Sequence, residues 1–469
     1  MTVFMDDDIL LESKLAKELY YDFAQQIPII DYHCHISADD IARNRKYENP
    51  TQIMLGGDHY KWRLMRFVGI DEMCITGSAS DYEKFVAFAE AIQLSVGHPV
   101  YMWTHMELKT YFNYTGTLSP DTVEDVWNIC CNKLKNGLTV REIMKRSAVN
   151  VICTTDDPVD DLEAHRICKK DRTLEVSVLP TFRPDKAVNI GKKEFNTYIT
   201  HLSNVVGKKI DSLPMLKEVL EERLLFFIKN GCKISDHGLD KICFNWCSDE
   251  CANKIFDRVM KGEPLDYEQE TQYITNMMIF FGRIYAKHNI VMQLHYGALR
   301  NINGKMMQKL GPDTGFDCIN DAGCGVELAK YLDCLESSGE LPRTIVYSLN
   351  PTDNALLDTI VGSFFEEGVR GKVQHGAAWW FNDNLNGIEE QLTRYASLNP
   401  IGAFLGMLTD SRCFLSFSRH DFFRRIFCNW MAKQILSGGY PFERKTIESI
   451  IKKVSYENCN EYFQFGRDL

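Results

Sequence analysis

Short runs of apolar and β-branched residues recur along the chain, and each run ends in a cluster of polar or charged residues. Strands that are buried on both faces have this continuous apolar pattern, whereas half-exposed strands alternate between apolar and polar residues. The chain contains eight such runs, at residues 27–30, 149–153, 174–179, 232–234, 290–294, 344–348, 372–374 and 404–408. The pattern predicts eight parallel strands, of which the fourth and the seventh are short.

Helical patterns lie between these runs, most clearly at residues 216–229, 270–287 and 387–397. Strands that alternate with helices are typical of α/β proteins, and eight such units predict a (β/α)₈ TIM-type barrel. Active sites of such barrels lie at the carboxyl ends of the strands. The polar clusters that follow the apolar runs fall at these ends.

The first and second predicted strands are far apart in the sequence. The stretch between them, from about residue 37 to 146, is much longer than an ordinary connection and has helical patterns at 81–93 and 121–135. We interpret it as a helical insertion that covers the mouth of the barrel. Because the chain has no internal repeat and no flexible linker, residues 1–469 are predicted to form a single domain.

Composition and charge narrow the classes of partner. The chain is 45% hydrophobic and 25% charged, as expected of a compact folded protein. Its formal net charge of −11 argues against binding to nucleic acid or to an anionic membrane. An anionic ligand would therefore need a local basic pocket. The sequence shows neither a signal peptide nor a long apolar run, so we expect a cytoplasmic protein.

The 16 cysteines are scattered over the chain and do not form a secreted disulfide framework, so we expect free, mostly buried thiols. Cys243, Cys247 and Cys251 are spaced by four residues, which predicts a buried stripe on one helical face. The alternative is a structural metal site, which would need a fourth ligand that the neighbouring sequence does not supply.

The strongest local motif is the sequence Asp-Tyr-His-Cys-His at residues 31–35. Side chains alternate along an extended strand, so His33 and His35 would point to the same side and can bind one divalent metal through their imidazole nitrogens. The alternative is a pair of surface or core histidines at a strand end.

Further candidate ligands lie at the ends of other predicted strands. His237, His295 and His375 follow the fourth, fifth and seventh strands, so that five of the 12 histidines lie at predicted barrel rims. Asp410 follows the eighth strand and would complete a set of two histidines and one aspartate. The alternative for Asp410 taken alone is that it caps the following helix.

Together, the first-strand His-x-His and the eighth-strand aspartate resemble the amidohydrolase superfamily. Longer strings resemble the uronate (glucuronate) isomerase family within it. These strings are DHYKWR at 58–63, TTDDP at 154–158, PTFRPD at 180–185, SDHG at 235–238, LHYGALRN at 294–301 and LTDSR at 408–412. They extend over nearly the whole chain and are far more specific than His-x-His alone.

The resemblance implies a metal site and a reaction. His33, His35 and Asp410 would bind one divalent metal, zinc in this family, with His295 beside it. No lysine on the fourth strand is available to bridge a second metal. The reaction would be the reversible conversion of D-glucuronate to D-fructuronate, and of D-galacturonate to D-tagaturonate, by proton transfer between C2 and C1 through an enediolate.

The remaining roles also follow the resemblance. Arg183 and Arg412 have planar guanidinium groups that suit the substrate carboxylate or an oxyanion, although either can be a surface ion-pair residue. Asp410 would accept the C5 hydroxyl proton during ring opening. Tyr60 would transfer the C2 proton with Arg412 nearby to lower its pKa, and His59 would bind the sugar. Read without the family, Tyr60 is a packing residue. Trp379 and Trp380 form either a wall for the sugar or the rim of the barrel.

Two other functions use the same fold. A metal-dependent hydrolase of lactones, amides or phosphoesters would use the same ligands to activate water, but the long strings favour the isomerase. A barrel that only binds a sugar acid would be expected to have lost part of its ligand set, which is intact here. We expect a small-molecule sugar-acid substrate. The oligomeric state stays open, although barrels of this kind often self-associate.

Overall fold

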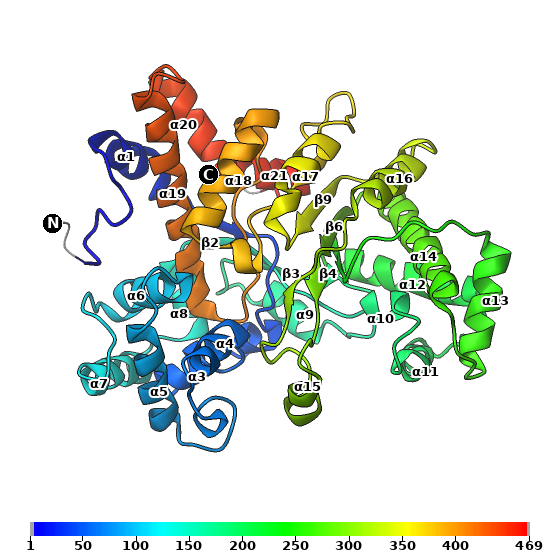
Figure 1. Cartoon of the computed structure of the whole chain (residues 1–469), viewed down its shortest axis with the longest axis horizontal. Coiled ribbons are helices and arrows are strands. Elements are labelled where there is room, and N and C mark those ends of the chain that lie inside the picture. The colour runs from blue at the N-terminus through cyan, green and yellow to red at the C-terminus, as the bar shows by residue number, and fades with distance from the viewer. Residues whose placement is uncertain (1–3, 467–469) are drawn as a thin grey trace.

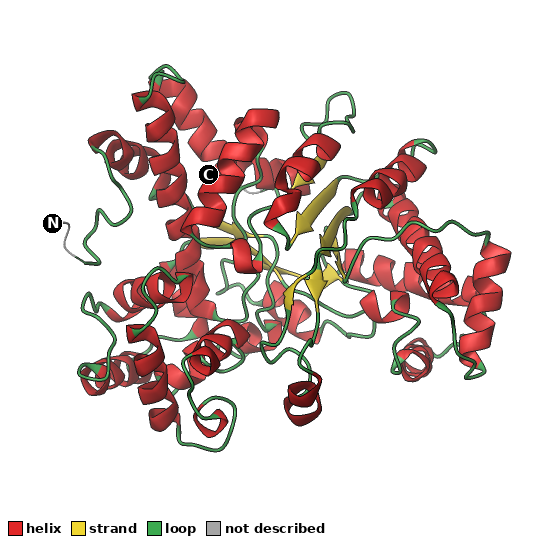
Figure 2. Ribbon diagram, in the orientation of Figure 1, coloured by secondary structure: helices red, strands yellow, loops and turns green. Residues whose placement is uncertain are grey.

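The structure is a computed structural model that describes residues 4–466. Parallel strands occupy the centre of the molecule and helices surround them (Figure 2). The strands form two parallel sheets with the orders β1-β2-β3 and β4-β5-β6-β9-β10. Their bounds are β1 Ile29–Asp31, β2 Val149–Cys153, β3 Ser177–Leu179, β4 Thr181–Phe182, β5 Ile234–Leu239, β6 Val291–Tyr296, β9 Thr344–Ser348 and β10 Val373–His375.

The two sheets are continuous with each other through β3 and β4, which only Pro180 separates. Proline has no N–H group and therefore interrupts a ladder. The segment that follows β2 bonds to both strands. Thr154 donates its N–H to Leu179 of β3, and Asp156 donates its N–H to Thr181 of β4. β3 and β4 are thus one interrupted barrel strand.

Seven of the eight predicted strands are confirmed, but residues 404–408 do not form a strand. Gly406 interrupts them with a left-handed φ of +75°, and a β-carbon there would lie 2.0 Å from the Val454 carbonyl oxygen. The segment nevertheless occupies the eighth position, since Asp410 donates its N–H to the His33 carbonyl and His35 donates to the Ser411 carbonyl. The fold is the predicted α/β barrel, with an irregular eighth segment.

The helices around the barrel include the three predicted from periodicity, which are α12, α14 and α18. The outer helices are α9 Glu163–Lys170, α10 Asp185–Val188, α11 Phe195–Val206, α12 Leu213–Lys229, α13 Asp249–Met260, α14 Tyr267–Lys287, α16 Gly325–Glu336, α17 Asn354–Val361, α18 Leu385–Leu398 and α19 Ser418–Leu436. A hairpin of β7 Ala298–Leu299 and β8 Cys318–Ile319 encloses α15 Gly304–Leu310. Short helical turns η3 Pro351–Asp353, η4 Trp380–Asn382, η5 Ile401–Ala403 and η6 Phe414–Phe417 precede the later helices.

The long connection between β1 and β2 is helical, and we call residues 38–146 the cap. Its helices gather on one side of the molecule, in blue and cyan, away from α12 to α14 (Figure 1). They are α2 Ala38–Ala42, α3 Pro50–Met54, α4 His59–Phe67, η2 Glu72–Cys74, α5 Asp81–Gln93, α6 Pro99–Phe112, α7 Val123–Lys135 and α8 Val140–Arg146. The predicted helices at 81–93 and 121–135 correspond to α5 and α7.

The first and last helices of the chain pack together, because α1 contacts α19 and η1 contacts both α19 and α20. Their bounds are α1 Lys14–Leu19, η1 Tyr20–Ala24, α20 Arg444–Lys452, η7 Lys453–Glu457 and α21 Asn458–Phe463. Among the described residues, no helix is both long enough and apolar enough to span a membrane.

All 16 cysteines are free thiols, as expected. The predicted helical stripe is wrong, however, because α13 begins only at Asp249, after its N-cap Ser248. Cys243 and Cys247 therefore lie in the irregular segment before the helix. The serine side chain accepts the N–H of Cys251, which fixes the start of the helix here.

Candidate active site

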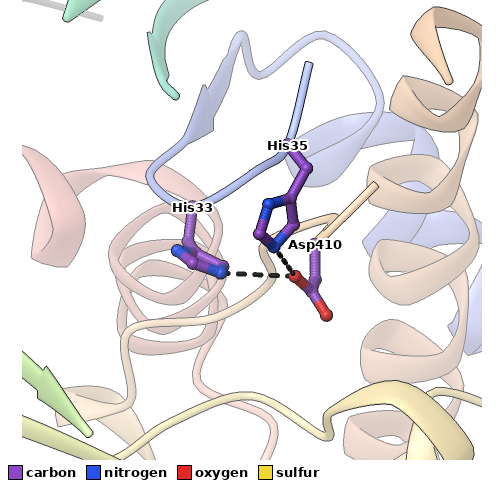
Figure 3. A group of neighbouring side chains, drawn as sticks. All are labelled: His33, His35 and Asp410. Carbon is purple, nitrogen blue, oxygen red and sulfur yellow. Dashed lines mark ion pairs between the residues drawn. The ribbon is translucent and has the colours of Figure 1, made fainter. Parts of the chain in front are cut away.

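The end of β1 and the irregular eighth segment bring three potential metal ligands together (Figure 3). His33 Nε2 lies 3.3 Å and His35 Nε2 lies 3.1 Å from the same oxygen, Oδ1 of Asp410. The three ligand atoms all lie within 4.8 Å of one another. The predicted same-side orientation of His33 and His35 is confirmed, and backbone hydrogen bonds between the two segments fix it.

The donor set fits a divalent metal. Two imidazole nitrogens and one carboxylate oxygen are the ligands that zinc and similar ions prefer. Burial opposes ionisation of Asp410, but the two histidines hold its pKa well below the usual value. Burial lowers the pKa of His35 to about 4, so this imidazole is neutral and its nitrogen is free to bind a cation. Trp379 donates its indole N–H to Oδ2 of Asp410 and so leaves Oδ1 facing the histidines.

Two residues of this region have left-handed backbone conformations that non-glycine residues rarely adopt. Asp410 has a φ of +47° and Trp380 a φ of +51°. Such conformations persist only where surrounding contacts enforce them, and they are common at functional sites.

A second group adjoins the first at the ends of β5 and β6. The buried carboxylate of Asp236 bonds His295 Nδ1 at 2.7 Å and lies 3.1 Å from Arg183 Nη1. Together with His33, Asp236 and His295 also offer three ligand atoms within 4.8 Å. Because the Arg183 guanidinium neutralises Asp236, this group is better explained as an ion-paired network than as a second metal site. Arg183 reaches Asp236 alongside Gly238, where a β-carbon would lie only 2.3 Å from Nη2.

The candidacy of His237 and His375 as metal ligands is wrong. Adjacent side chains on a strand point to opposite faces. Asp236 faces the site, and His237 faces outward, where its Nε2 bonds the Tyr285 hydroxyl of α14 at 3.0 Å. His375 bonds Asp358 of α17 through Nδ1 at 2.7 Å. Both histidines join strands to the surrounding helices, and sequence reasoning missed Asp236.

The cap contributes His59 and Tyr60 from the first turn of α4. The N-cap Asp58 accepts hydrogen bonds from the N–H groups of Tyr60 and Lys61 and fixes this end of the helix. Lys61 is buried beneath it, with Nζ 3.3 Å from Glu107 of α6. The rings of His59 and Tyr60 stack with centroids 4.8 Å apart. A local hydrogen-bonded turn and a buried ion pair thus hold both rings at the barrel mouth.

Nine of the candidate residues line one cavity of about 270 Å³, a size suited to a small molecule. They are His33, His35, His59, Tyr60, Arg183, His295, Trp379, Asp410 and Arg412. The cavity also has walls that sequence reasoning did not single out, from Thr155, Gly238, Leu239, Asp240, Ala298, Arg300 and Asp313. Trp380 lines it too, so both tryptophans face the cavity.

The charges around Tyr60 differ from the prediction. Burial and the charge of Asp410 raise the pKa of the Tyr60 phenol well above its usual value, and the cation that lowers it most is Arg419. Arg412 acts instead on His59, whose pKa is lowered first by burial and then by this arginine. Arg412 also lies 3.9 Å from Asp313 across the cavity.

Comparisons with known proteins point to one family. A family described as glucuronate isomerase matches residues 1–463. A uronate isomerase of Endomicrobium trichonymphae is 48% identical over 466 residues, which cover 99% of this chain and 100% of that protein. A uronate isomerase of Lachnospira eligens is 47% identical over the same coverage.

Solved structures show the same fold. The uronate isomerase of Thermotoga maritima aligns with a TM-score of 0.93 at 33% identity, over 98% of this chain and 100% of that one. The glucuronate isomerase of Caulobacter crescentus aligns with a TM-score of 0.92 over 100% and 98% of the two chains. Its 22% identity supports the fold alone. Full-length similarity at this level, together with the family match, identifies the chain as a member of the uronate isomerase family.

Proposed function

We propose that this protein is a uronate isomerase that interconverts D-glucuronate with D-fructuronate, and D-galacturonate with D-tagaturonate. The observation that carries the proposal is the convergence of Arg183, the His33–His35–Asp410 group and Tyr60 on one small cavity. These groups supply an anion site, a metal site and a proton-transfer group, which an aldose–ketose isomerisation of a sugar acid requires.

Arg183 binds the substrate carboxylate. Its Nε and Nη1 already pair with Asp185 and Asp236, so the guanidinium is fixed before substrate arrives. The guanidinium faces the cavity, and its planar donors suit a carboxylate. The net charge of −11 would otherwise repel an anionic uronate, and Arg183 supplies the local basic group that binds it.

His33, His35 and Asp410 would hold one divalent ion, zinc by the family resemblance, which would act as a Lewis acid on the substrate carboxylate and a neighbouring hydroxyl. Asp410 exchanges the proton of the C5 oxygen when the ring opens. Its second oxygen accepts from Trp379, which orients the carboxylate towards the cavity. His59 and His295 hydrogen-bond the sugar.

Tyr60 performs the isomerisation. As the phenolate it removes the proton from C2, the C2 electrons form the C1–C2 double bond, and the carbonyl electrons move to O1. The resulting enediolate takes the proton back at C1, while a proton passes from O2 to O1 and leaves a ketone at C2. No atom is gained or lost. Arg412 donates to the oxyanion from across the cavity.

The test is to incubate the purified protein with D-glucuronate in deuterium oxide and to follow the sugar by proton NMR. Fructuronate signals with deuterium at C1 support the enediolate route. A Tyr60→Phe variant should lower kcat by about a hundredfold, within the range for loss of a general acid–base group, with little change in KM. An unchanged rate in that variant would end the candidacy of Tyr60.

A metal-dependent hydrolase is the competing function, because the same three ligands can activate water. Absence of ketose from a folded, metal-loaded protein would favour it, and lactones and amides would then be assayed. We further propose that residues 1–469 act as one barrel domain with the cap as part of the site, since His59 and Tyr60 reach the cavity from α4.

A further inference from the structure

Arg419 and Asp383 form a buried ion pair. Neither residue takes part in the proposed reaction. Arg419 lies in the first turn of α19, and Asp383 follows η4 and Trp380. The guanidinium Nη2 contacts the Asp383 carboxylate, and the two side chains are only 4% and 1% exposed. Burying two charges costs several kcal/mol per ion unless they are paired. Because forming so deeply buried a pair is costly, we look for its function in the groups that it contacts.

The indole of Trp103 joins this pair to Tyr60. Trp103 belongs to α6 of the cap, which packs against α19 (Figure 1). Cζ of Arg419 lies 4.2 Å from the centre of the Trp103 ring, and the Tyr60 ring lies 6.3 Å from it in an edge-on arrangement. A cation over an indole face is attracted by the ring, which holds the guanidinium in place.

The charges that affect the Tyr60 phenol most are mostly negative. Asp410, Asp383 and Asp58 all raise the pKa of its phenol, and the adjacent His59 ring stacks on it. Arg419 lowers this pKa, and its effect is larger than that of its partner Asp383. The cationic end of the pair thus acts on Tyr60 more strongly than the anionic end.

We propose that Arg419, held by Asp383 and Trp103, is a positioning residue that stabilises the negative charge of Tyr60 during proton transfer at C2 of the uronate. This inference rests on the proposed function. Arg419 would thus be the cation that acts on Tyr60. Arg412 acts instead on His59 and lies near Asp313. Asp383 keeps the guanidinium in place, and Trp103 shields the pair so that its field is not screened by water.

The first experiment separates charge from packing. Arg419→Met removes the cation but leaves Asp383 buried without a partner, so this variant should lose stability as well as rate. The double variant Arg419→Met/Asp383→Asn removes both charges and should recover the melting temperature. Its kcat should stay about tenfold below that of the wild type, with KM changed less than about twofold. Arg419→Lys keeps the charge and should recover part of kcat.

A second measurement does not depend on turnover. With 3,5-difluorotyrosine incorporated at position 60, ¹⁹F NMR reports the titration of this phenol in the substrate-free protein. Its apparent pKa should rise by about one unit in the double variant. The matched control is Arg425→Met, which removes another buried arginine of α19 that pairs with an aspartate, Asp421, and lies over the ring of Tyr20. That control should lower the melting temperature and leave the ¹⁹F titration unchanged.

The outcomes are distinct. A folded double variant with wild-type kcat and an unchanged ¹⁹F titration would overturn the proposal and make the pair purely structural. If the wild type does not isomerise D-glucuronate, the proposed function fails, and a shifted titration would then support only the electrostatic coupling of Arg419 to Tyr60.

Discussion

Trp379 donates its indole N–H to Oδ2 of Asp410 over 2.7 Å, and Oδ1 of the same carboxylate faces His33 and His35. The indole thereby fixes the orientation of the carboxylate, with Oδ1 towards the two histidines. Groups that orient a ligand in this way contribute about ten- to a hundredfold to metal affinity.

Trp379→Phe should therefore weaken binding of a divalent metal by at least about tenfold while the protein stays folded. Competition with a chelator, followed by metal analysis, measures the effect. Trp380→Phe is the matched control, because Trp380 stacks on Phe381 and lines the same cavity. Equal metal affinity in both variants and the wild type would show that the hydrogen bond to Asp410 is unimportant.

Removing a ligand should have a larger effect. His33→Ala or Asp410→Asn leaves two of the three donors, so the purified variants should contain little metal and show little isomerase activity. Metal content by mass spectrometry and thermal melting with and without added zinc test this. The wild type should gain stability on addition of zinc, and the variants should not. Wild-type metal content in either variant would reject the ligand assignment.

Arg183→Met should weaken uronate binding and leave metal content unchanged. The KM for D-glucuronate should rise at least tenfold, which corresponds to about 1.4 kcal/mol or more of lost binding. Asp236 also loses its cation, so the melting temperature should fall. The double variant Arg183→Met/Asp236→Asn should recover stability but not KM. An unchanged KM in that double variant would remove Arg183 from the substrate site.

Lys61 and Glu107 form a buried pair beneath the first turn of α4, with both side chains almost fully inaccessible. Lys61→Met leaves Glu107 unpaired and should lower the free energy of unfolding by about 3–5 kcal/mol. Chemical denaturation measures this loss. Lys61→Met/Glu107→Gln should recover most of it. A single variant as stable as the wild type would contradict the role of this pair in fixing the cap.

Asp156 should make stability depend on pH. Burial raises its pKa to about 7 from an ordinary value near 3.8, although hydrogen bonds from Thr154 and Thr181 oppose the shift. A raised folded-state pKa gives stability that is present below about pH 4 and is lost as the pH rises through about 7. Asp156→Asn should remove this loss, so its stability relative to the wild type should increase from pH 4 to pH 8. Chemical denaturation of both proteins at pH 4 and pH 8 measures this. The same difference in unfolding free energy between variant and wild type at both pH values would contradict the expectation.

The sequence by itself determined the order and place of seven barrel strands, because each is a continuous apolar run whose burial does not depend on its neighbours. It also determined that His33 and His35 share one side, since alternation is a property of a single strand. The long family strings supplied six further residues, all of which line one cavity: His59, Tyr60, Arg183, His295, Asp410 and Arg412.

The tertiary structure decided what depends on distant parts of the chain. Whether Asp236 or His237 faces the site is a matter of how β5 is oriented in the barrel, and two adjacent polar residues give no local signal for either. The eighth segment is irregular because Gly406 passes close to Val454, which is remote in sequence. The pair of Arg419 and Asp383 joins residues from different elements beside Tyr60 of the cap. A buried charge is stabilised by a partner that is close in space but distant in sequence. The periodicity of the sequence therefore does not predict which residues pair.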